Sequence, residues 1–160
     1  MPDHSLSVSD VSALSRERDR RQFSDYVSLH ATNKRFIPRE DETVLLKAAI
    51  SDFGMDRDQA QGVLHGIAQD KDIRLESQAE ENVRAFLKHR SRKDKVSRKD
   101  FNEAARMYRG LINDGLTLKQ AKQQVKRIMI REELRPRRIR LLFVPLPIPG
   151  ARRWYNRIRV

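Results

Sequence analysis

The chain has 160 residues, of which 34 are Lys or Arg and 22 are Asp or Glu, so its net charge is +12. It contains no cysteine, which excludes disulfides, thiol catalysis and thiolate metal sites and favours a reducing, cytoplasmic location. With 38% apolar and 35% charged residues, this length allows one ordinary domain with extensions, a real core and a strongly ionic surface.

The positive charge is concentrated at the C-terminal end. Residues 134–160 carry eight arginines and no lysine, aspartate or glutamate, so everything before Leu134 holds only +4 of the net charge. This shift in composition predicts three parts: a polar N-terminal segment at 1–33, a helical body at 34–133 and an arginine-rich C-terminal arm at 134–160.

Neither a signal peptide nor a transmembrane segment is expected. The first residues have no apolar core and no basic leader. The longest apolar run, 141–149, has nine residues including three prolines, whereas about 20 apolar residues are needed to span a bilayer.

Within the N-terminal segment, residues 10–30 predict an exposed amphipathic helix. Leu14, Phe23 and Val27 recur roughly at helical spacing. The mixed charges at 16–21 between them favour a solvated surface.

Five capped helices are expected in the body. Pro38 opens the first, and Gly54 supplies its left-handed stop. The inner face of this helix is predicted to be Val44, Leu45, Ala48, Ala49 and Phe53. The other four begin at Asp56, Ser77, Ser97 and Thr117, each followed three residues later by a side chain suited to a capping box. The predicted fold class is all-α: a compact bundle of about five to six helices in helical hairpins, with an extended Arg/Pro-rich C-terminal arm.

The sequence echoes itself at one fixed offset. Gly54, Gln59, Ala60 and Ile67 recur as Gly115, Gln120, Ala121 and Ile128. The same offset places the expected 77–89 helix over residues 16–28, so one interpretation is two three-helix copies. The other is that capped helices after glycine stops are common in helical hairpins, without shared ancestry.

Both expected hairpins can be compared with the DNA-reading helix-turn-helix. The hairpin at 46–67 resembles it in spacing, but its second helix begins Asp56-Arg57-Asp58, and these acids would repel phosphate. The second hairpin suits a groove better, because its last helix carries basic and amide side chains and no acid before Glu132. These side chains are Lys119, Gln120, Lys122, Gln123, Lys126 and Arg127. Amides can pair with adenine and lysine with guanine, and plain helix packing is the alternative interpretation.

A calcium-binding loop is not expected at 70–81. Acidic residues there have roughly EF-hand spacing, but Arg74 replaces a ligand oxygen and Leu75 occupies the position that requires glycine. The loop and helix start at 93–101 resemble those of tellurite-resistance-type (TerB-like) helical domains, with residues 34–133 covered. The resemblance implies an all-helical fold, whereas lysine and arginine at some of that family's acidic positions put a metal role in doubt.

Enzyme chemistry is not expected. The four histidines are scattered, with no pair at metal-binding spacing. There is no nucleophile elbow, phosphate-binding glycine loop or zinc-protease helix. We therefore predict no catalytic residue, no metal and no cofactor.

Two basic segments are the candidate anion-binding sites. The first is the link between two helices at 88–99, whose candidate residues are Lys88, Arg90, Arg92, Lys93 and Lys95. The second is the arm, with Arg135, Arg137, Arg138, Arg140, Arg152, Arg153, Arg157 and Arg159. Arginine binds phosphate bidentately, and Trp154 and Tyr155 would offer stacking faces to bases. The leading hypothesis is therefore a non-enzymatic module that binds RNA or DNA.

A different class of function uses the same residues. Residues 139–149 combine an apolar run with alternating prolines and could lie in the groove of a protein partner. Flanking arginines would also attract an anionic membrane surface, at about 1 kcal/mol per cation. The alternative hypothesis is a helical adaptor that docks through this segment.

Overall fold

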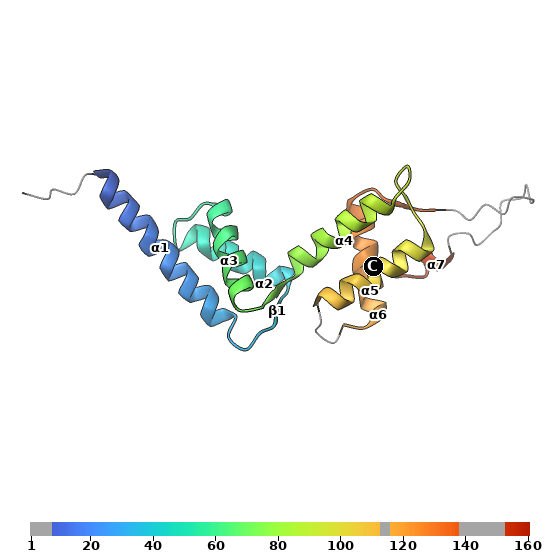
Figure 1. Ribbon diagram of the computed structural model, residues 1–160, viewed down its shortest axis with the longest axis horizontal. Helices are drawn as coiled ribbons and strands as arrows, with labels where there is room; N and C mark the ends of the chain where they lie inside the picture. Colours follow the sequence, from blue (N-terminus) through green and yellow to red (C-terminus); the bar gives the residue numbers. More distant parts are fainter. Residues whose placement is uncertain (1–7, 113–115, 138–152) are drawn as a thin grey trace, which may run out of the picture. The chain divides into compact units, whose positions relative to one another are not determined.

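The computed structural model describes residues 8–112, 116–137 and 153–160, which form seven helices and four two-residue strands. The helices are α1 (Val8–His30), α2 (Arg39–Ser51), α3 (Arg57–Asp70), α4 (Glu76–Arg90), α5 (Arg98–Ile112), α6 (Leu118–Arg131) and α7 (Arg153–Asn156). The strands are β1 (Phe36–Ile37), β2 (Arg74–Leu75), β3 (Lys95–Val96) and β4 (Arg135–Pro136). The predicted all-α class is confirmed (Figure 1).

The chain folds as two units, Met1–Leu75 and Glu76–Val160. This division differs from the single 34–133 body expected from composition, because the N-terminal helix belongs to the first unit and β4 belongs to the second. No helix among the described residues is both long enough and apolar enough to cross a membrane.

The two units repeat one order of elements: a helix, a strand, a helical hairpin and a second strand. In each unit the two strands pair in parallel, β1 with β2 and β3 with β4. The Arg74 N–H donates to the Arg35 carbonyl at 3.0 Å, and the Arg135 N–H donates to the Asp94 carbonyl at 2.7 Å. Arg74 and Arg135 are separated by the same offset as the echoed residues, and each unit has three helices in this order, as in one of the two interpretations of the sequence echo. Common ancestry of the two units stays a prediction.

The predicted caps explain where most of the helices begin. The Asp56 carboxylate accepts the Gln59 N–H at 2.8 Å, and Thr117 forms a complete capping box with Gln120. Gly54 has a φ of +61°, the left-handed value expected of a helix stop. The predicted start at Ser77 is wrong, because β2 leads directly into α4 at Glu76.

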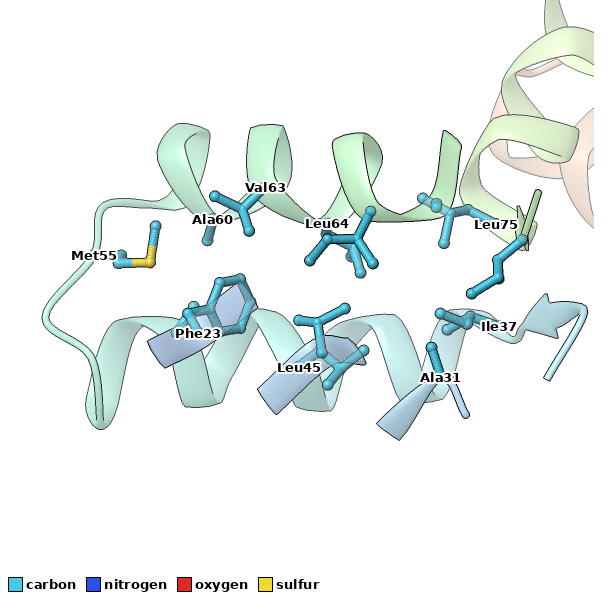
Figure 2. Close-up of a cluster of buried hydrophobic side chains, with 14 residues drawn as sticks. Phe23, Ala31, Ile37, Leu45, Met55, Ala60, Val63, Leu64 and Leu75 are labelled. Carbon is cyan, nitrogen blue, oxygen red and sulfur yellow. The ribbon is translucent and has the colours of Figure 1, made fainter. Parts of the chain in front are cut away.

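The core of the first unit joins all three of its helices (Figure 2). Leu45 of α2 and Leu64 of α3 are buried together with Phe23 and Val27 of α1. Burying each such side chain stabilises the unit by about 1.5–3 kcal/mol. The helix predicted as exposed at 10–30 therefore buries one face of its later turns, at Phe23 and Val27, whereas Leu14 and Leu29 are exposed.

One inner-face prediction for α2 is wrong. Val44 is 54% exposed, whereas Glu42 is only 5% exposed. Glu42, Leu45 and Ala49 follow one another at helical spacing and define the buried face, which places Val44 on the outer side.

The second unit buries an apolar set that includes two aromatic side chains, Phe101 and Tyr108, where the first buries Phe23. Phe101 and Tyr108 of α5 pack with Val125 and Met129 of α6, and all four side chains are fully buried. The Tyr108 hydroxyl donates to the Glu76 carboxylate at 2.5 Å and so joins α5 to the start of α4. Burial and this hydrogen bond raise the pKa of Tyr108.

Candidate nucleic-acid interface

The two units differ sharply in charge. Residues 1–75 hold 11 basic and 13 acidic side chains, a net charge of −2. Residues 76–160 hold 23 basic and 9 acidic side chains, a net charge of +14. A polyanion would therefore be attracted to the second unit.

The β3–β4 pair joins the two basic segments singled out in the sequence. Lys95 and Arg135 are partners in the parallel register, and the Arg137 N–H donates to the Val96 carbonyl at 2.7 Å. Pro136 has no N–H to offer and lies where β3 requires none. Because side chains alternate along a strand, Val96 and Pro136 are buried while Lys95, Arg135 and Arg137 are exposed.

A tight turn places more cations next to this strand pair. Arg92 and Lys95 exchange two backbone hydrogen bonds, at 3.2 and 3.1 Å, around Lys93 and Asp94. Both central residues have positive φ, 50° and 57°, as a type I′ turn requires. We call the exposed residues Arg92, Lys93, Lys95, Arg135 and Arg137 the basic corner. None of the five forms an ion pair with another described residue.

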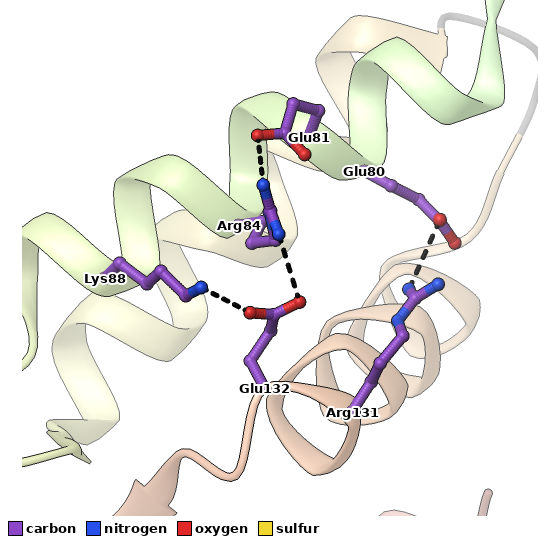
Figure 3. Close-up of polar contacts among 6 residues, drawn as sticks. All are labelled: Glu80, Glu81, Arg84, Lys88, Arg131 and Glu132. Carbon is purple, nitrogen blue, oxygen red and sulfur yellow. Dashed lines mark hydrogen bonds and ion pairs between the residues drawn. The ribbon is translucent and has the colours of Figure 1, made fainter.

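Two other predicted residues, Lys88 and Arg90, are engaged in ion pairs, of which Figure 3 shows that of Lys88. Lys88 binds Glu132 at 2.5 Å, and Arg84 binds the other oxygen of Glu132 at 3.6 Å. The hydrogen bond from Lys88 and the charges of Lys88 and Arg84 lower the pKa of Glu132. Arg90 lies 3.7 Å from both Asp100 and Glu103. Lys88 and Arg90 therefore hold α4 against its neighbours and offer less of their charge to a ligand.

The C-terminal residues return to the same unit and pack on it. The Trp154 and Tyr155 rings lie 5.1 and 6.2 Å from the Phe101 ring. Both side chains are half-buried, and burial raises the pKa of Tyr155. The two rings proposed to stack on bases thus make tilted and edge-to-face contacts with an aromatic ring of the protein.

Two side chains of α6 hold this C-terminal segment through its backbone. Lys126 donates to the Tyr155 and Ile158 carbonyls at 3.3 and 2.6 Å, and its ammonium lies 4.7 Å from the centre of the Tyr155 ring. Gln123 donates to the Arg159 carbonyl at 2.8 Å. The sequence does not predict these contacts, because their partners lie about 30 residues away and no local pattern around Gln123 or Lys126 indicates them.

The remaining arm residues divide into two groups. Arg157 and Arg159 are exposed, and the backbone of Arg153 lies in α7. Arg138, Arg140 and Arg152 lie outside the described residues, as does the docking segment proposed at 139–149. The structure therefore brings together only some of the predicted cations from each basic segment, at the basic corner.

No group of three or more histidine, aspartate or glutamate side chains is placed to hold a metal ion within the described ranges. Comparison of the chain with family models, curated proteins and solved structures finds no match. The resemblance to TerB-like domains accordingly stays a prediction.

Proposed function

We propose that the protein is a non-enzymatic nucleic-acid-binding module whose contact surface is the basic corner of the second unit. The observation that carries the proposal is the β3–β4 pair, which brings two basic segments from distant parts of the sequence onto one exposed edge. A cytoplasmic location, favoured by the absence of cysteine, is part of the same proposal.

The chemistry of the corner suits phosphate. Arg92, Arg135 and Arg137 carry planar guanidinium groups that bind phosphate oxygens in pairs, and Lys93 and Lys95 add point charges. The exposed acids nearest in sequence, Asp94 and Glu133, are outnumbered by five cations. Backbone hydrogen bonds fix the turn and the strand pair, so little ordering is needed when a ligand binds.

A salt titration with full-length protein tests this proposal. The variant R92Q/K95Q/R135Q removes three charges from the corner, and R16Q/R18Q/R20Q removes three exposed charges from α1 as a matched control. If each corner residue contacts one phosphate, the first variant flattens the plot of log K against log salt for duplex DNA by about 2.7 and the control leaves it unchanged. An equal effect of the two variants would refute the assignment to the corner.

The same proteins also distinguish the nucleic-acid proposal from the adaptor hypothesis. Saturable binding to anionic vesicles or to a protein partner, without salt-dependent binding to nucleic acid, would support docking through 139–149 and overturn the proposal above. Loss of the apolar run at 141–144 should leave nucleic-acid binding intact.

A further inference from the structure

We infer that the nucleic acid bound at the basic corner is double-stranded and is held through its phosphate backbone without reading base sequence. This inference rests on the proposed function and narrows it to one class of ligand. Three sets of contacts support it.

The amide side chains suited to base reading are already hydrogen-bonded inside the protein. Gln120 accepts from the N–H and the hydroxyl of Thr117, at 3.0 and 2.6 Å. Gln123 donates to the Arg159 carbonyl, and Gln124 accepts from Arg127 at 3.3 Å. Each of these bonds already uses one of the two polar ends that an amide offers to adenine, so the fold sets the positions of these amides.

The aromatic rings of the C-terminal segment are engaged as well. Trp154 and Tyr155 lie 5.7 Å apart and both contact Phe101, and Lys126 covers the Tyr155 ring. Proteins that bind single strands without sequence preference depend on rings that are free to stack on bases. These two rings instead anchor the end of the chain.

The exposed cations lie close together on two paired strands. Lys95 and Arg135 stand on adjacent strands, about 4.8 Å apart, and Arg135 and Arg137 are about 6.6 Å apart along one strand. A duplex offers one charge per about 1.7 Å of axis, twice the density of one of its strands. A rigid, purely electrostatic surface therefore gains more from a duplex.

The test compares the full chain on four probes of equal length: duplex DNA, duplex RNA and the two corresponding single strands, each in an A·T-rich and a G·C-rich sequence. We expect both duplexes, or one of them, to bind at least about tenfold more tightly than either single strand at equal salt. Within a duplex class the two sequences should differ by less than about threefold. The duplex that binds more tightly identifies the natural form.

Trp154 provides a direct readout, since it is the single tryptophan of the chain. Its emission should stay nearly constant as single strands or duplexes are added, because the ring stays on Phe101. Strong quenching at saturation, equal or tighter binding of single strands, or a tenfold sequence preference would overturn the inference. Absence of salt-dependent binding to all four probes would overturn the proposed function itself, and the two failures are therefore distinct.

Discussion

The two units share an order of elements, a parallel strand pair and even the hydrogen bond that closes it, yet their net charges are −2 and +14. In the first unit Arg74 occupies the place that Arg135 has in the second, but Lys34 nearby is paired with Asp41 at 3.0 Å. The fold is thus fixed by helix caps, left-handed residues after helices and a few buried positions, whereas exposed residues can differ between the units. The units thus differ most in the charge of their surfaces.

The largest effect on stability is expected from a large-to-small substitution in the core of one unit, with the core of the other unit unchanged. Phe101→Ala should destabilise the second unit by about 3–5 kcal/mol, and Leu45→Ala should destabilise the first by about 2–5 kcal/mol. Hydrogen exchange should show each loss of protection confined to its own unit. Equal loss in both units after either substitution would show that they unfold as one.

A smaller effect is expected at Tyr108, whose buried hydroxyl donates to the half-buried Glu76 carboxylate; the first helix of the hairpin in the other unit, α2, has no tyrosine. Tyr108→Phe should cost about 1.5–3 kcal/mol, because the Glu76 carboxylate loses a donor. The half-buried Tyr26 of the first unit is the control, and Tyr26→Phe should change the free energy of unfolding in urea very little. Equal effects at both positions would show that the hydrogen bond adds nothing.

Lys126 tests the anchor of the C-terminal segment. Lys126→Met removes two hydrogen bonds and a cation–π contact, and should lower stability by about 1 kcal/mol. The emission of Trp154 should shift to the red as its contact with Phe101 loosens. His65 occupies the matching position of α3 and is exposed, so His65→Gln should change neither property.

The smallest effect concerns pH. Because Lys88 and Arg84 lower the pKa of Glu132 in the folded state, the stabilisation is complete above the pKa of the unfolded chain and is lost as the pH falls through the folded pKa. Chemical denaturation between neutral pH and pH 3 should therefore show a smaller loss of stability in Glu132→Gln than in the natural chain. Glu133→Gln, at an exposed neighbour with no ion pair to the described residues, should follow the natural chain.

Local patterns in the sequence are sufficient to predict most of the helices. Caps such as Thr117 with Gln120 and buried stripes such as Ala121, Val125 and Ile128 depend on neighbours three or four residues apart, which a sequence displays directly. The prediction fails at Val44 because Glu42 is buried despite its charge, and residue type alone does not reveal that.

The candidate site is harder to predict because its contacts are distant in sequence. Each strand has only two residues, too few to form an alternating pattern, so the pairing of Lys95 with Arg135 leaves no trace in the sequence. Leu134 is 5% exposed and precedes β4, which shows that the arm begins as part of the fold. Cutting the chain after Glu133 would remove core structure, and substitution of exposed cations is therefore the sharper experiment.

A single substitution in the turn at Lys93 and Asp94 should raise the stability of the protein. Two successive residues in left-handed conformation cost about 1–2 kcal/mol each when they carry a side chain, and glycine avoids most of that cost. Asp94→Gly would also remove an acid from the middle of the basic corner while keeping the carbonyl that receives Arg135. Asp94→Gly should therefore raise both the stability of the turn and the attraction of the basic corner for a polyanion.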